Sequence, residues 1–79
     1  MKKFVTELLG KQVMTTEGKI LGAIDNMIVD TKSGELAHLL VIPDPNIDPR
    51  AYRRDSQNRL VLPFDKLKSV RDVVVIGPL

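Results

Sequence analysis

Two aspartates in the first half of the chain, Asp25 and Asp30, are the first candidates for chemistry. Paired carboxylates can divide general acid and general base roles when both point into one site. Side chains alternate between the faces of a strand, so these two residues would point to opposite faces. A bulge at Asn26 would realign them, but aspartate more commonly bonds nearby backbone amides in turns. We therefore expect Asp25 and Asp30 to cap turns and hairpins.

A loop in the second half of the chain spaces its oxygen-bearing side chains as an EF-hand calcium loop does. These residues are Asp44, Asn46, Asp48 and Asp55. The match is incomplete, because Pro49 stands where the sharp turn needs glycine and Asp55 is shorter than the usual bidentate glutamate. No flanking helices are indicated either. The pattern favours a solvated loop, and we predict no metal.

The remaining candidates for catalysis or cofactor binding are weak. His38 is the only histidine and the chain has no cysteine, so no nucleophile, base and orienting group can be assembled. Between hydrophobic neighbours, His38 is typical of a sheet residue with a hydrogen-bonded ring nitrogen. Gly10-Lys11 and Gly18-Lys19 lack the upstream glycine of a phosphate-binding P-loop and precede strands. We predict that the protein is not an enzyme and binds no cofactor.

The densest basic stretch surrounds the single tyrosine, Tyr52. Its arginines are Arg50, Arg53, Arg54 and Arg59. Arginine can contact phosphate and an aromatic ring can stack a base, so RNA binding is an alternative function. One aromatic residue is a small stacking platform, and arginines equally steer acidic protein partners. We expect contact with a protein rather than with RNA.

Length and composition limit the architecture. A chain of 79 residues makes one domain, residues 1–79, with a modest core. Its 43% hydrophobic and 28% charged residues are ordinary for a folded protein, and its net charge is only +2. In the amino-terminal sequence "MKKFVTELLGKQ", polar residues interrupt the apolar run too early for a signal peptide or a membrane span. The expected compartment is the cytoplasm.

Turn residues divide the chain into short extended segments. Glu17-Gly18 and the stretch from Asp30 to Gly34 predict hairpin turns, because glycine supplies a positive φ and aspartate bonds the backbone. Gly22 interrupts a long apolar run and predicts a bend in that strand. The three prolines of residues 43–58 predict a rigid excursion that cannot join a sheet smoothly. Helix-like apolar spacing before Gly10 predicts one short helical turn, formed by Phe4, Val5, Leu8 and Leu9.

These segments predict an all-β fold of five to six short antiparallel strands, arranged as a small barrel or a sandwich. The pieces "LLGKQVMTTEGKILGAIDNMIVDTKSGELAHLLV" and "LVLPFDKLKSVRDVVVI" together resemble the PRC-barrel family, seen in the H subunit of photosynthetic reaction centres and at the end of ribosome-maturation factors. The residues that carry the resemblance are Leu9, Gly10, Lys11, Val13, Gly18, Lys19, Gly22, Asp25, Asp30, Gly34, Pro63 and Phe64.

The resemblance implies an interaction module rather than a catalyst. Stand-alone members of this size are similar to short archaeal PRC-barrel proteins, some of which act in cell division. The ribosome-maturation relatives imply an RNA-binding or ribosome-maturation accessory as the alternative. The proline-rich residues 43–58 depart from the family pattern and leave the choice of partner open.

Apolar side chains on both faces of two predicted strands suggest where a partner binds. Residues 35–42 and 73–76 carry aliphatic residues at both parities, whereas a small barrel has one interior. Either the amino-terminal segment and the proline-rich loop cover the second face, or a second copy does. In the latter case we expect a two-fold homodimer. The predicted partner-binding residues are Leu39, Val41, Arg50, Tyr52, Arg53, Arg54, Val73 and Val75.

Overall fold

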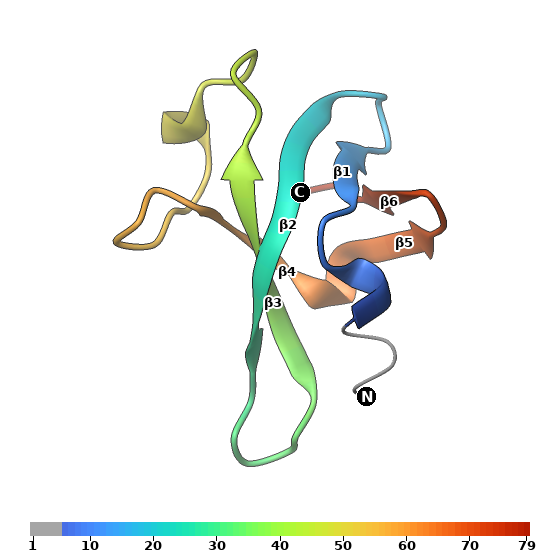
Figure 1. The fold of residues 1–79 in the computed structure, drawn as a ribbon, viewed down its shortest axis with the longest axis vertical. Coiled ribbons are helices and arrows are strands. Elements are labelled where there is room, and N and C mark those ends of the chain that lie inside the picture. Colours follow the sequence, from blue (N-terminus) through green and yellow to red (C-terminus); the bar gives the residue numbers. More distant parts are fainter. Residues whose placement is uncertain (1–5) are drawn as a thin grey trace.

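The computed structural model describes residues 6–79 and contains one curled, six-stranded sheet (Figure 1). The strands are β1 (Gln12–Thr15), β2 (Ile20–Val29), β3 (Leu36–Pro43), β4 (Leu60–Pro63), β5 (Leu67–Val70) and β6 (Val73–Ile76), with short 3-10 helices η1 (Pro49–Ala51) and η2 (Phe64–Lys66). Their order in the sheet is β4-β3-β2-β1-β6-β5. The sheet is barrel-like but not closed, which confirms the predicted all-β class.

One pair of strands differs from the antiparallel prediction. β1 and β6 run parallel and in continuous register, with Val13 opposite Val74, while the other strand pairs are antiparallel. In Figure 1, β5 and β6 run nearly crosswise to β2 and β3. The parallel pair therefore joins the first strand of the chain to the last and bends the sheet around its core.

The amino-terminal helical turn is only partly within the described residues. Residues 6–8 are helical, and Leu8 is fully buried. Gly10 then takes a φ of 84°, and its amide donates to the carbonyl of Ile24 at 2.8 Å. Phe4 and Val5, which the predicted turn includes, lie outside the described residues.

Both predicted hairpin turns are confirmed. At the first, Gly18 has a φ of 90° and its amide donates to the carbonyl of Thr15 at 2.9 Å. At the second, one carboxylate oxygen of Asp30 accepts the amides of Lys32 and Ser33 at 2.8 and 3.2 Å. Asp30 therefore caps this turn, as an aspartate that bonds its own following backbone does.

Gly22 lies where two strands approach too closely for a side chain. Its φ is 151°, and a Cβ at this position would overlap the backbone carbonyl of Ile42 on β3. The register between β1 and β2 shifts by one residue beside it, at Leu21. The predicted bend is thus a β-bulge next to a glycine that lets β2 curve against β3.

A second bulge explains why apolar residues occur at both parities of β2. The register with β3 skips Asp25, because Ile24 faces Val41 and Asn26 faces Leu40. Each bulge reverses which parity points inward. Leu21 and Ile24 are therefore both buried, with Met27 packed against the core after them, although simple alternation would separate the first two.

The second face of β3 is largely covered within the chain. Leu39 and Val41 are fully buried and Leu40 is 6% exposed, so residues of both parities are enclosed. Leu8 from the amino-terminal turn and Ile47 from the proline-rich loop belong to the same core cluster. Leu40, the buried residue of the other parity, lies outside this cluster, so cover of the second face by these two segments stays a prediction, whereas Leu39 and Val41 are core residues. Leu39 and Val41 are consequently not accessible to a partner, and the exposed residue of this strand is Ile42, at 52%.

The proline-rich loop returns to the sheet, contrary to the expectation that it stays outside the ladder. Arg54 forms an isolated antiparallel bridge with Leu60, and the amide of Val61 donates to the carbonyl of Arg53 at 2.9 Å. The three prolines all precede this stretch, so its amides remain free to pair. The loop thereby covers part of the outer edge of β4.

Candidate functional site

The predicted arginine cluster separates into paired and unpaired side chains. The Arg50 guanidinium contacts the carboxylate of Asp48 at 3.1 Å, and Arg54 donates to the side-chain oxygen of Asn58 at 2.7 Å. The hydrogen bonds from Arg50, side chain first and then backbone, lower the pKa of Asp48. Arg53 alone of the four forms no side-chain hydrogen bond or ion pair within residues 6–79.

Arg59 holds the end of the proline-rich loop to the outer surface of β2. Its guanidinium contacts Asp55 and Asp25, each at 2.8 Å, and only 17% of its side chain is exposed. Hydrogen bonds to Asp25 and then Asp55 raise the pKa of Arg59. Desolvation opposes ionisation of Asp55, but hydrogen bonds from Arg59 and Gln57 outweigh it and lower the pKa of Asp55. We call this set, Asp25, Asp55 and Arg59, the Arg59 clasp.

An apolar hollow lies where Arg53 and Tyr52 meet the end of β4. Its volume is about 240 Å³. Tyr52 is half-buried against the core, so its position is fixed by packing. The hollow is lined by Ala51, Tyr52, Arg53, Val61, Leu62, Pro63, Lys66 and Leu79.

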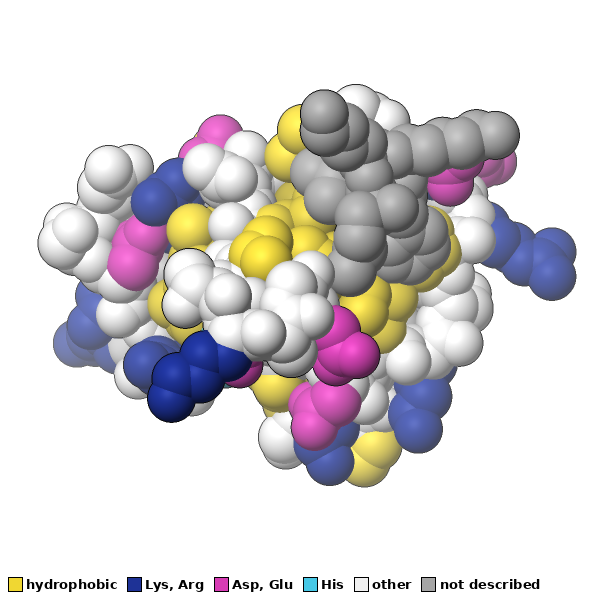
Figure 2. Space-filling model, turned by 90° about the horizontal axis from the view of Figure 1, so that it is seen from below, with side chains coloured by type: hydrophobic (Ala, Val, Ile, Leu, Met, Phe, Trp, Pro, Cys, Tyr) yellow, Lys and Arg dark blue, Asp and Glu magenta, His cyan; other side chains and the backbone are white. Residues whose placement is uncertain are grey.

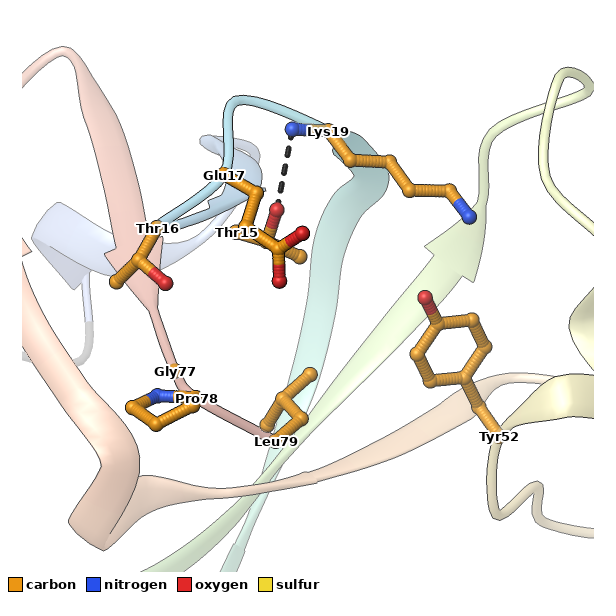
Figure 3. A pocket seen from close by; sticks show the side chains of 8 residues that line it. All are labelled: Thr15, Thr16, Glu17, Lys19, Tyr52, Gly77, Pro78 and Leu79. Carbon is orange, nitrogen blue, oxygen red and sulfur yellow. Dashed lines mark hydrogen bonds between the residues drawn. The ribbon is translucent and has the colours of Figure 1, made fainter.

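A second, more polar hollow lies on the other side of Tyr52 and Leu79, which line both (Figure 3). Its volume is about 250 Å³, and its other lining residues are Thr15, Thr16, Glu17, Lys19, Gly77 and Pro78. The Thr16 amide donates to the Ile76 carbonyl at 3.1 Å, and the Gly77 amide to the Lys66 carbonyl at 2.9 Å. These bonds hold the last residues of the chain between the first hairpin turn and η2. In Figure 3 the Lys19 side chain extends toward the Tyr52 hydroxyl.

The two hollows share Tyr52 and Leu79 as lining residues, and we call them together the Tyr52 groove. Its cations are Lys19, Arg53 and Lys66, and none of them has a side-chain hydrogen bond or ion pair within the described part of the chain. Glu17 is the one acid among the described lining residues. Sequence analysis identified Tyr52 and Arg53 but missed Lys19, Lys66 and Leu79. No local signal marks these three, because they come from separate segments.

The predicted contact residues of β6 lie on the outside of the sheet. Val73 and Val75 are half-exposed, while Val74 and Ile76 between and after them are fully buried. Cross-strand pairing sets Val75 beside Met14 on β1, and Met14 beside Ile20 on β2. Directly opposed residues share a face of the sheet. Ile20, Met14, Val73 and Val75 therefore form an apolar outer strip across three strands.

Hydrophobic side chains also reach the surface on the face that Figure 2 shows from below. Among the large aliphatic side chains exposed in the described chain are Leu9, Ile28 and Val29, at 44%, 39% and 47%. Exposed aliphatic side chains are ordinary on folded proteins. Their exposure alone therefore carries no functional assignment.

The other residues predicted as candidates for chemistry do not come together at a common site. Asp25 pairs with Arg59 and Asp30 caps its turn, so the two carboxylates do not share a site. Asp44 accepts the amide of Asn46 at 2.8 Å, and residues 6–79 contain no group of three or more acids or histidines placed to hold a metal. His38 lies half-buried on β3 between Ile28 and Pro63. Its ring has no hydrogen bond to another residue in the described chain, unlike the prediction.

Comparison with known proteins adds one positive result. A family model described as the PRC-barrel domain matches residues 1–79. No curated protein matches the chain. Within residues 6–79, no helix is long and apolar enough to cross a membrane.

Proposed function

The chain belongs to the PRC-barrel domain family, and from this membership we propose that it is a non-enzymatic module that docks a protein partner. PRC-barrel domains are small β-barrel modules often found in protein-interaction contexts. They form a family of small, non-catalytic domains. The arrangement of the candidate residues is consistent with this role, because charged groups are paired or dispersed rather than converging on a reaction centre.

The Tyr52 groove is the observation that best supports docking. It combines an apolar floor with cations that form no side-chain hydrogen bond or ion pair in the described chain, whereas Arg50, Arg54 and Arg59 are already engaged. Tyrosine and arginine side chains beside a hollow, here the half-buried Tyr52 and the exposed Arg53, are typical of residues that contribute strongly to protein interfaces. We therefore place the partner contact at Tyr52 and Arg53.

A second copy of the chain is the partner that we propose for the outer strip. Its four residues are apolar and half-exposed, and a two-fold axis would set the strip against its own equivalent. Val73 and Val75, predicted contact residues, form its β6 end. The homodimer and the groove use different surfaces, so one does not require the other.

The narrower assignments that the family resemblance implies stay predictions. They are a role in archaeal cell division, a cytoplasmic location and, as the alternative function, an accessory role in RNA binding or ribosome maturation. The alternative draws on the same cations as protein docking. The two functions differ in whether the chain retains a protein or an RNA.

A pull-down with the tagged full-length chain from native lysate, with and without ribonuclease, tests the proposed function. We expect protein partners that survive ribonuclease and are lost with Arg53→Glu. Lys32→Glu, the same charge reversal in the exposed β2–β3 turn, is the matched control and should retain them. Partners that disappear with ribonuclease, or RNA recovered in their place, would replace protein docking by the alternative.

A further inference from the structure

We propose that the Tyr52 groove takes an extended acidic segment of the partner, with one apolar side chain seated in the hollow between Tyr52 and Lys66. This inference rests on the proposed function and specifies the chemistry of the docked segment. Its basis is the division of the groove into an apolar lobe and a polar lobe that share Tyr52 and Leu79. A segment crossing both lobes must pass over these two side chains.

The charges along the groove select an acidic occupant. Arg53 and Lys66 line the apolar lobe and Lys19 lines the polar lobe, so cations lie at both ends of the path. Of the acidic side chains in the described structure, Glu17 lines the groove, while Asp48, in the proline-rich loop, is bonded to Arg50 and interacts electrostatically with Lys19. Complementary charge steers the approach of a partner and fixes its direction in the site. Carboxylates on both sides of the anchoring residue would meet these cations.

The size of the apolar lobe suits a side chain better than a free ligand. Its volume of about 240 Å³ lies below the roughly 300–1,000 Å³ of typical small-molecule sites. Its walls are supplied by Ala51, Val61, Leu62, Pro63 and Leu79, which offer no directed hydrogen-bonding side chains. An aliphatic or aromatic anchor would bury apolar surface there, as central residues of protein interfaces do.

The same features disfavour a nucleic-acid strand. Strands without base pairing bind by stacking successive bases on aromatic side chains along a basic track. Tyr52 is the one aromatic residue among the described lining residues of the groove, and its ring is half-buried against the core. RNA therefore becomes a measurable competitor rather than the proposed occupant.

The test is titration of the isotope-labelled full chain with a short synthetic peptide that has a central leucine flanked by glutamates. We expect amide shifts in the spectrum at Lys19, Tyr52, Arg53, Lys66 and Leu79, with the β2–β3 turn unchanged. Replacing the leucine by serine, or the glutamates by glutamine, should each weaken binding. Lys66→Glu should raise the Kd about fivefold or more, whereas Lys32→Glu should leave it within about twofold.

Three results would overturn the inference. The first is the absence of amide shifts at the groove residues with millimolar peptide. The second is an equal loss of peptide affinity in Lys32→Glu and Lys66→Glu. The third is an oligouridylate of matched length that binds the groove more tightly than the peptide does. The proposed function fails separately, because it depends on ribonuclease-resistant protein capture. A captured partner that shields another surface from hydrogen exchange would remove the acidic-segment inference and leave protein docking in place.

Discussion

The guanidinium of Arg59 donates to the carboxylate of Asp25 at 2.8 Å and so joins two segments that lie 34 residues apart in the sequence. Asp25 is available for this contact because it is the extra residue of a β-bulge. Arg59 also holds Asp55, at the start of the turn that returns the chain to β4. The Arg59 clasp therefore fixes the loop that carries Tyr52 and Arg53.

Replacing Arg59 by methionine should lower the melting temperature and weaken peptide binding in the groove. The long apolar side chain keeps part of the packing but leaves Asp25 and Asp55 without their cation. Arg50→Met, which removes an exposed pair in the same loop, is the control and should have a smaller effect because exposed ion pairs stabilise little. Circular dichroism melts and the peptide titration measure the two effects. Equal effects in the two variants would contradict a special role for the clasp.

Acid should destabilise the fold partly through Asp55 and Asp48. Their pKa values are lowered in the folded chain, so folding holds these groups ionised more strongly than the unfolded chain does. Their contribution to folding stability is fully present above the ordinary aspartate pKa of about 3.9. It is lost as the pH falls through the lower pKa values of the folded chain. Thermal melts over a pH series should show this decline. Asp55→Asn should be less stable than the wild type near neutral pH and should lose less on acidification.

Gly22→Ala should destabilise the protein by roughly 2 kcal/mol or more, because the new methyl group would overlap the carbonyl of Ile42 and strain the backbone. Gly34→Ala is the matched control. Gly34 also has a positive φ, of 74°, but no atom lies within 4 Å of the position of an added Cβ. Urea denaturation should therefore show that Gly22→Ala is much less stable than Gly34→Ala. The opposite order would show that the close approach of β2 and β3 is not the reason for glycine at position 22.

Two aliphatic residues on β3 should respond very differently to truncation. Leu39→Ala removes a fully buried side chain and should cost about 2–5 kcal/mol. Ile42→Ala removes one that is 52% exposed and should change stability by about 0.5 kcal/mol or less. Chemical denaturation of both variants checks whether Leu39 belongs to the core rather than to a contact surface.

Light scattering coupled to size exclusion tests the proposed homodimer. The wild type should elute as a dimer at micromolar concentration, and Val75→Asp should shift it to the monomer by placing a charge in the outer strip. Ile42→Asp, which adds the same charge at an exposed site of β3, should remain dimeric. A monomeric wild type would contradict the proposed homodimer. A dimer that persists in Val75→Asp would show that the interface lies on another surface.

The sequence by itself determined the local structure and the fold class. Glycine at a positive φ and aspartate bonded to its own turn act over a few residues, so Gly18 and Asp30 marked their hairpins without knowledge of the rest of the chain. The order of these turns and strands also sufficed for the PRC-barrel resemblance, which the family match confirms.

Which side chains are buried and which stay exposed depends on the tertiary structure. The bulges at Leu21 and Asp25 reverse the inward parity of β2, and residues of both parities of β3 are buried. The Tyr52 groove joins the first hairpin, the proline-rich loop, η2 and the last residues of the chain. The register of paired strands and the path of the loop back to the sheet depend on contacts between segments that are distant in the sequence. Residue spacing in the sequence carries information only about neighbours along the chain.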